Sequence, residues 1–172
     1  MCVPDNTDLK ILKILQENSR ISFKKIARKV GVSEATVYNR VKRMQEDRLI
    51  EKYTIKVNLE NFENAWFSSI IRVRLESGKY VPELSEMLKQ IPQVHALYDV
   101  TGEYDFVLIT RFTNHKELFS FIRELSSVGH VAQTNSQIVM KVFKEDFSVN
   151  FEVMEKSSRK KDMPSSLNLT SQ

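Results

Sequence analysis

The 172-residue sequence predicts an α+β protein in which a winged helix-turn-helix is followed by a ferredoxin-like βαββαβ domain. Two patterns lead to this fold class. Apolar residues recur at helical spacing in three short segments before residue 50, and β-rich runs alternate with two helical patterns between residues 66 and 148. The predicted parts are residues 1–57, a linker over 58–65, the second domain over 66–148 and a disordered tail over 149–172.

The first two predicted helices each carry one apolar stripe. Residues 8–18 (DLKILKILQEN) place leucines and isoleucines on a face broad enough to anchor a small core. Ser22 offers a cap for the segment FKKIARKV, in which Phe23 and Ile26 belong to the buried side. Gly31 ends this helix, because glycine readily adopts the left-handed conformation that closes many helices. Short helices on either side of such a turn are typical of a helix-turn-helix.

The third helix begins after Ser33, whose hydroxyl can cap its first turn. Val37, Val41 and Met44 share the buried side at spacing i, i+4, i+7, so the opposite side faces solvent. That outer side is small, polar and basic. It fits a major groove, where asparagine can pair with adenine and lysine or arginine meets phosphate or guanine; an ordinary solvated helix face is the alternative. The predicted DNA contacts are Lys24, Lys25, Ser33, Ala35, Thr36, Tyr38, Asn39, Arg40, Lys42 and Arg43.

A β-rich run follows the third helix. Residues 49–58 (LIEKYTIKVN) alternate apolar and polar side chains, which predicts the strands of a wing. The next residues are polar and lack a clear period, so the domain boundary is placed there.

The second part alternates strands and helices in the order βαββαβ. Strands are expected over residues 66–75, 94–100, 104–112 and 137–144, with a glycine turn joining the middle two. One helix starts near Pro82 and stops at Pro92. Thr113 or Asn114 caps the other helix, whose buried positions are expected to be Leu118, Phe119, Ile122 and Leu125. Several strands are apolar on both faces, which indicates that a second copy of the chain covers the face without helices.

The turn and third helix resemble the Lrp/AsnC (leucine-responsive, feast/famine) family of prokaryotic and archaeal regulators. Two positions differ from the family pattern: Gln45 stands where glutamate is usual, and Arg48 stands where glycine is usual. A non-glycine residue in a left-handed helix end costs on the order of 1 kcal/mol, so the third helix is expected to end differently here. The matching positions are Gly31, Val32, Ser33, Val37, Arg40, Val41, Met44, Leu49 and Ile50.

A second match lies in residues 101–105 (TGEYD), which resemble the Gly-x-Tyr-Asp hallmark of the family's amino-acid-sensing domain. The resemblance covers residues 5–146 and implies a non-enzymatic regulator that forms homodimers, tetramers or octamers and binds an amino-acid-like effector between dimers. Backbone NH groups at a glycine turn can hold a carboxylate, and a nearby acidic side chain can take an ammonium group. The alternative is a turn whose aspartate only bonds locally. The predicted effector contacts are Asp99, Thr101, Gly102, Glu103, Tyr104, Asp105, Thr134 and Ser136.

Two other functions stay open at this point. Some proteins that resemble this architecture are sirohaem decarboxylases, which need a tetrapyrrole pocket with suitably placed basic or histidine side chains. Here His95, His115 and His130 are scattered between predicted element ends, with no pair at metal-ligand spacing. No cofactor and no metal site is therefore predicted. An architectural DNA-binding protein without an effector is the third interpretation.

The charge distribution supports a nucleic-acid partner for the first part only. Residues 1–60 contain 13 Lys and Arg against 8 Asp and Glu, whereas residues 61–150 contain 9 against 11. The lone cysteine, Cys2, excludes an internal disulfide and a cysteine-based metal site within this chain. With no long apolar run and no leader pattern, a cytoplasmic protein without a membrane partner is expected.

Overall fold

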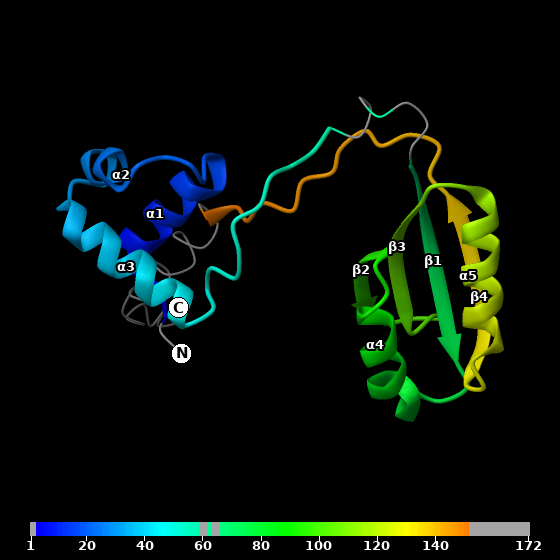
Figure 1. The fold of residues 1–172 in the computed structure, drawn as a ribbon. Coiled ribbons are helices and arrows are strands. Elements are labelled where there is room, and N and C mark those ends of the chain that lie inside the picture. Colours follow the sequence, from blue (N-terminus) through cyan, green and yellow to red (C-terminus); the bar gives the residue numbers. More distant parts are fainter. Residues whose placement is uncertain (1–2, 59–61, 63–65, 152–172) are drawn as a thin grey trace, which may run out of the picture. The chain divides into compact units, whose positions relative to one another are not determined.

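The computed structural model describes residues 3–58, 62 and 66–151 (Figure 1). The chain divides into two compact units, which are described separately below. The first comprises Met1–Lys56 together with the segment that starts at Asp146, and the second comprises Val57–Glu145.

Three helices form the first unit: α1 (Asn6–Glu17), α2 (Phe23–Val30) and α3 (Glu34–Glu46). Helix α1 starts two residues earlier than predicted, because Asp5 caps it in a reciprocal capping box with Asp8. Ser22 and Ser33 cap α2 and α3 as predicted. Gly31 ends α2 with a φ of 81°, which confirms the left-handed turn of the helix-turn-helix.

The core of the first unit lies where the three predicted apolar stripes meet. Ile11 of α1, Ile26 of α2 and Val37 of α3 are fully buried and belong to one cluster. Val41 and Met44 continue the buried side of α3, so the predicted orientation of this helix is confirmed and its opposite side faces outward.

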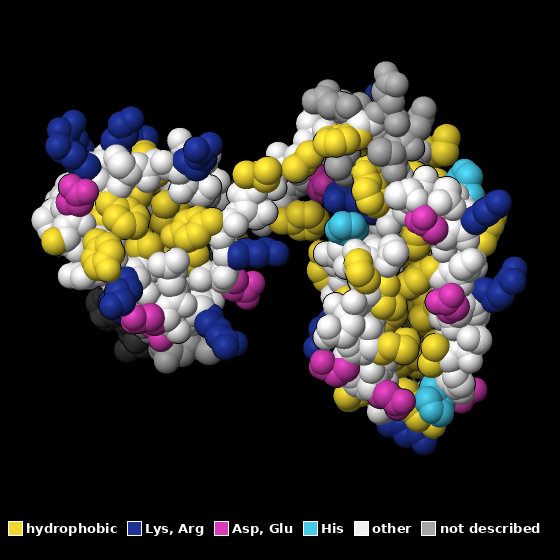
Figure 2. All heavy atoms as spheres, in the orientation of Figure 1, with side chains coloured by type: hydrophobic (Ala, Val, Ile, Leu, Met, Phe, Trp, Pro, Cys, Tyr) yellow, Lys and Arg dark blue, Asp and Glu magenta, His cyan; other side chains and the backbone are white. Residues whose placement is uncertain are grey.

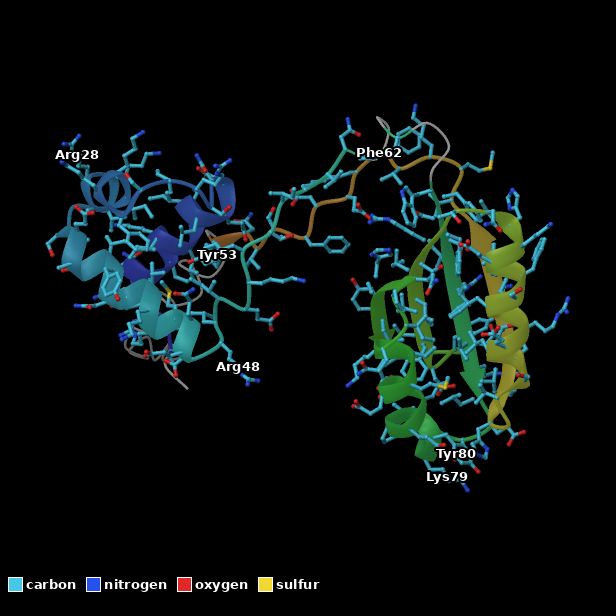
Figure 3. The ribbon with its side chains drawn as sticks, viewed as in Figure 1. Arg28, Arg48, Tyr53, Phe62, Lys79 and Tyr80 are labelled. Atoms are coloured by element: carbon cyan, nitrogen blue, oxygen red, sulfur yellow. The ribbon has the colours of Figure 1, made fainter. Side chains whose placement is uncertain are left out.

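The end of α3 differs from the sequence-based expectation. Arg48 adopts the left-handed conformation, with a φ of 57°, although glycine is usual there in the family that it resembles (Figure 3). The amides of Leu49 and Ile50 both donate to the carbonyl of Met44, at 2.8 and 3.0 Å. Ile50 also packs against the helical core. These contacts hold the usual turn despite the unfavourable residue, so the prediction of a different helix end is wrong.

The predicted wing strands are not formed within the described residues 51–58. Ile55 is 78% exposed, and Tyr53 and Val57 are about half exposed. A β-strand needs a hydrogen-bonding partner, and an alternating pattern in a single run does not supply one. The alternating sequence of residues 49–58 is therefore compatible with a strand, but no second strand pairs with it among the described residues.

The second unit is a four-stranded antiparallel sheet with two helices. Its strands lie in the order β2-β3-β1-β4, which with the chain order confirms the ferredoxin-like topology. The side of β1 that holds Ile71 and Val73 joins both helices in one core, with Leu88 and Leu118 as examples. The elements are β1 (Phe67–Leu75), the short 3-10 helix η2 (Gly78–Tyr80), α4 (Val81–Lys89), β2 (Val94–Asp99), β3 (Phe106–Phe112), α5 (His115–Ser127) and β4 (Val131–Ile138).

Two details of the second unit correct the sequence predictions. Strand β4 lies earlier than the predicted 137–144, because the more polar residues from Val131 onward pair with the open edge of β1. Two apolar residues of the predicted strand lie outside β4 and are exposed: Met140 is 95% and Phe143 is 89% exposed. On α5, Phe121 is buried, whereas the predicted core residue Phe119 is 60% exposed.

The strained end of α3 yields the first prediction. Replacing Arg48 by glycine should raise the free energy of unfolding by about 0.5–1 kcal/mol, because relief of the left-handed strain exceeds the added entropy of the unfolded chain. Chemical denaturation measures the change. The matched control is Gln45→Gly, which lies within α3 and should lower stability by about 1 kcal/mol. Loss of stability in both variants would contradict the assigned strain.

Candidate DNA-binding surface and effector loop

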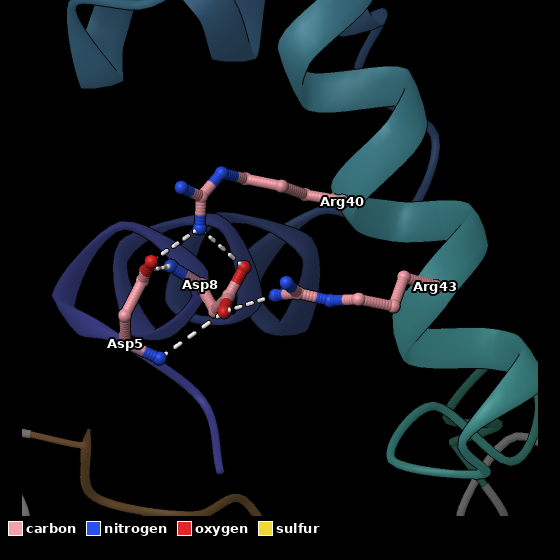
Figure 4. Close-up of polar contacts among 4 residues, drawn as sticks. All are labelled: Asp5, Asp8, Arg40 and Arg43. Atoms are coloured by element: carbon pink, nitrogen blue, oxygen red, sulfur yellow. Dashed lines mark hydrogen bonds and ion pairs between the residues drawn. The ribbon is translucent and has the colours of Figure 1, made fainter. Parts of the chain in front are cut away.

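A buried carboxylate connects the first helix to the outward-facing helix α3 (Figure 4). The Asp8 side chain is 1% exposed and accepts hydrogen bonds from Arg40 Nη1 at 2.9 Å and Arg43 Nη2 at 2.6 Å. Arg40 Nη1 also donates to Asp5 Oδ2 at 2.6 Å. We refer to Asp5, Asp8, Arg40 and Arg43 as the arginine clamp.

The clamp satisfies the physical requirements of a buried charge. A buried carboxylate is costly unless it is paired and hydrogen-bonded, and Asp8 has two guanidinium partners as well as the backbone NH of Asp5. The hydrogen bond from Arg40 lowers the pKa of Asp5 below its usual value, and the hydrogen bonds that Arg40 donates to Asp5 and Asp8 raise the pKa of Arg40. The clamp therefore fixes how α3 sits on the start of α1.

The first turn of α3 is held by local hydrogen bonds. Ser33 Oγ accepts from the backbone NH of Thr36 at 3.0 Å and lies 2.8 Å from Thr36 Oγ1. Ser33 and Thr36, which are among the predicted DNA contacts, thus stabilise the first turn of α3.

The outer side of α3 presents the residues predicted for base contacts. Ala35, Asn39 and Lys42 are exposed, and Tyr38 is 52% exposed. The ring of Phe23 on α2 meets the ring of Tyr38 edge-on, with centroids 6.2 Å apart, and thereby limits its orientation. This side offers a small residue, an amide, a phenol and an ammonium group to a partner.

A row of exposed cations lies on the neighbouring helix α2. Lys24, Lys25, Arg28 and Lys29 are all exposed. Figure 2 shows Lys and Arg side chains gathered along the edge of the first unit that bears α2, and Figure 3 labels Arg28 there. A row of exposed cations of this kind can contact a phosphate backbone.

The connection between β2 and β3 contains the predicted effector loop. Gly102 has a φ of 117°, which requires glycine. The Asp105 carboxylate accepts a hydrogen bond from the backbone NH of Leu75 at 2.7 Å, and the Asp105 amide donates to Val73 at 2.9 Å. Asp105 therefore bonds locally and fixes the end of β1, as in the alternative considered from the sequence.

Other predicted loop residues are more accessible. Asp99, Thr101 and Glu103 are exposed, and Tyr104 is half-buried. The guanidinium of Arg72 lies over the Tyr104 ring at 5.0 Å from its centroid. The loop thus offers exposed carboxylates, while its aromatic ring lies against a cation of β1.

The two predicted residues of β4 lie farther along the sheet. Thr134 pairs with Val73 of β1, and its hydroxyl lies 3.0 Å from that of Ser126 on α5. Ser136 pairs with Ile71 and is exposed. Strand β1 lies between both residues and β3, so they are not part of the loop itself.

Sequence reasoning missed the acidic half of the arginine clamp and the role of Arg72. The spacing of Asp5 and Asp8 is a capping signature, so it could have indicated that both residues lie at the start of α1. No local pattern indicates that Arg72 bonds Asn135 at 2.9 Å, because these residues meet only through strand pairing.

Among the described residues, no group of three or more His, Cys, Asp or Glu side chains is placed to hold a metal ion. No helix in the described part of the chain is long and apolar enough to cross a membrane.

A helix-turn-helix with a basic outer side, joined to a ferredoxin-like domain, defines a two-domain DNA-binding regulator. Comparisons with known proteins agree. Residues 5–45 match the AsnC-type helix-turn-helix domain, and residues 68–149 match the Lrp/AsnC ligand binding domain.

Similar proteins align over more than four fifths of this chain and over nearly the whole of their own length. An uncharacterised HTH-type transcriptional regulator of Pyrococcus abyssi is 36% identical over 143 residues, which cover 83% of this chain and 96% of that protein. The HTH-type transcriptional regulator LysM of Saccharolobus solfataricus is 35% identical over 139 residues, covering 81% and 95%. A transcriptional regulator from Neisseria meningitidis, solved as an L-Met complex, superposes with a TM-score of 0.77 at 25% identity and covers 88% and 99%.

The chain therefore belongs to the Lrp/AsnC family and is a helix-turn-helix transcriptional regulator with a ligand-binding domain. This confirms the family resemblance and the fold class expected from the sequence. Nothing in the comparisons supports the sirohaem decarboxylase alternative.

The clamp yields the second prediction. Replacing Asp8 by asparagine should lower the free energy of unfolding by about 2–3 kcal/mol, the lower end for a broken buried pair, because the two arginine side chains are partly exposed. Chemical denaturation at neutral pH measures the loss. A change below about 0.5 kcal/mol would contradict the assigned role of the clamp.

The matched control is Asp5→Asn, which keeps a capping side chain and should cost only about 0.5 kcal/mol, because the Asp5 side chain is 53% exposed. The folded-state pKa of Asp5 is lowered, so its contribution is present above the unfolded pKa and is lost as the pH falls through the folded one. Asp5→Asn should remove this part of the acid sensitivity.

Proposed function

We propose that this regulator binds double-stranded DNA as a homodimer, with α3 in the major groove, and that an amino acid bound at residues 101–105 alters this binding. The observation that carries the proposal is the division of α3 into a clamped inner side and an exposed, polar and basic outer side.

The residues of α3 take different roles in this proposal. Asn39 and Ala35 face the base edges, because both lie exposed on the outer side. Arg40 positions the helix instead of contacting DNA, because two carboxylates engage its guanidinium and its side chain is 26% exposed. Arg43 is 42% exposed, so it can bind Asp8 and still present part of its guanidinium to a phosphate.

Lys24 and Lys25 contact phosphates from α2, where both are exposed. Such contacts add affinity for any sequence and make binding dependent on salt. Base contacts from α3 and phosphate contacts from α2 can therefore be distinguished by experiment.

The sheet supports the proposal of a homodimer. On the face opposite the helices, Ile70 lies opposite Ile109, and Val107 lies between Arg72 and Tyr98. Tyr98 is 44% exposed in the single chain. An apolar sheet face of this kind is normally covered, and a second copy would also bring two recognition helices to one site, about 34–36 Å apart or a multiple of that. The proposal includes assembly of such dimers into tetramers or octamers.

The effector is proposed to be an amino acid. The similarity to a regulator solved with L-Met supports this ligand class. At the loop, the backbone around Gly102 would hold the carboxylate, and the exposed side chains of Glu103 and Asp99 are better placed for the ammonium group than Asp105, which is already bonded to β1. A small ligand that binds one state more tightly shifts the equilibrium by about 1–3 kcal/mol.

The roles of α2 and α3 yield the third prediction. Asn39→Ala should relax sequence preference in a selection from randomised sites, because a base-reading side chain is lost. Lys25→Ala should weaken all sequences alike and lower the salt slope by about one unit. The two variants control for each other. Unchanged selectivity in Asn39→Ala, or an effect of Lys25→Ala on one site sequence only, would contradict the assignments.

The effector proposal yields the fourth prediction. The purified protein should bind DNA from upstream of its own gene in the presence of random competitor DNA at fixed salt. One member of a panel of amino acids should change the amount of this DNA that is bound. Glu103→Gln should reduce the response without abolishing DNA binding, because the side chain lies on the exposed loop of the second unit. Specific retention that no amino acid changes would contradict the effector, and weak retention without sequence preference would favour an architectural DNA-binding protein.

A further inference from the structure

The chain beyond β4 attaches to both units in turn. We call residues 139–151 the C-terminal strap. At its start, the amide of Val139 donates to the carbonyl of Ser68 on β1 at 2.9 Å. Further along, both carboxylate oxygens of Glu145 accept hydrogen bonds from Arg111 Nη2 on β3, at 2.9 and 3.0 Å. Because β1 lies between β4 and β3, the strap passes β1 before it reaches this ion pair (Figure 1).

The Arg111–Glu145 pair is a better anchor than a typical surface ion pair. The two side chains are only 21% and 30% exposed, which reduces screening by solvent. It therefore fixes the middle of the strap to the sheet of the ligand-binding unit.

The end of the strap belongs to the DNA-binding unit. The side-chain amide of Gln16 on α1 makes two hydrogen bonds with the backbone of Val149: Nε2 donates to the carbonyl at 3.0 Å, and Oε1 accepts from the amide at 2.9 Å. Phe151 follows and packs against the core of the three helices. An amide that pairs with a peptide group in both directions holds the backbone in one orientation.

These attachments are suited to release and rebinding. The Gln16 bonds are exposed, and Phe151 is only partly buried, so the end of the strap is less firmly fixed than the helical core. Met140 is 95%, Phe143 is 89% and Phe147 is 72% exposed, so these apolar side chains do not anchor the strap within the single chain.

We propose that the C-terminal strap is a releasable second connection between the units. The chain already joins them once, between Lys56 and Val57. A strap attached at Glu145 to the sheet and at Val149 and Phe151 to the helices limits their relative motion, and its release lets the DNA-binding unit move more freely. The consequence for regulation rests on the proposed function: a change at the sheet would reach the recognition helix through this segment.

The experiment measures the distribution of distances between the units. Spin labels are attached to cysteines at the exposed positions Lys10 and Glu124, in a chain that also carries Cys2→Ser. Excess unlabelled chain ensures one labelled chain in each assembly. The distance distribution should broaden in Gln16→Leu, in Glu145→Gln and in a chain that ends at residue 145. Hydrogen exchange at the backbone amide of Val149 should become about tenfold faster in Gln16→Leu, because this amide no longer donates to Gln16 Oε1.

Matched controls separate the strap from general effects of substitution. Gln45→Leu makes the same replacement on α3, Glu83→Gln removes an exposed charge from α4, and a chain that ends at residue 155 keeps Val149 and Phe151. All three should keep the wild-type distribution. A wild-type distribution in Gln16→Leu and Glu145→Gln would overturn the proposal, even if the chain that ends at residue 145 behaved differently.

The distance measurement does not depend on DNA or on an effector, so its outcome is distinct from that of the proposed function. If an amino acid alters DNA retention by the wild-type protein, Gln16→Leu should still bind DNA but show a smaller response. A full response in this variant would overturn the regulatory consequence of the strap.

Discussion

The burial of one carboxylate, Asp8, determines how the helix that we propose to bind DNA is held. A charge with 1% exposure must be compensated, and the two arginines that compensate it both belong to α3. Their engagement turns the inner side of α3 toward α1 and leaves Asn39 and its neighbours outward. The same helix therefore contains cations that hold it in place and polar groups that are free to meet a partner.

The ligand-binding domain follows a related constraint. Asp105 resembles part of a sensing hallmark, but its carboxylate is used to bond the backbone of Leu75. It shapes the loop that Gly102 permits, and the proposed function assigns contact with a ligand to exposed neighbours such as Glu103. In both domains an acidic residue near the proposed site, Asp8 or Asp105, is already used to hold the fold together. Its role can be assigned only when its hydrogen-bond partners are known.

Local signals explain which features could be predicted from the sequence. The serine caps, the Gly31 turn and the buried side of α3 depend on neighbours within a few residues, and all were found. The position of β4 was not predicted, because it depends on long-range pairing with the edge of β1. The polar segment that begins at Val131 forms this strand, although the segment 137–144 is more apolar. The ion pair between Arg40 and Asp5 was missed for the same reason, since residues 35 positions apart meet only in the folded unit, and the capping spacing of Asp5 and Asp8 does not reveal their arginine partners.

The central claim is that α3 reads DNA in the major groove from two copies of the chain. Methylation interference on a selected site tests it most directly, because methylation of guanine N7 blocks the major groove, whereas methylation of adenine N3 blocks the minor groove. The account predicts interference at guanine N7 in two clusters, separated by about 10–10.5 base pairs or a multiple of that. Interference confined to adenine N3, or a single cluster, would contradict it.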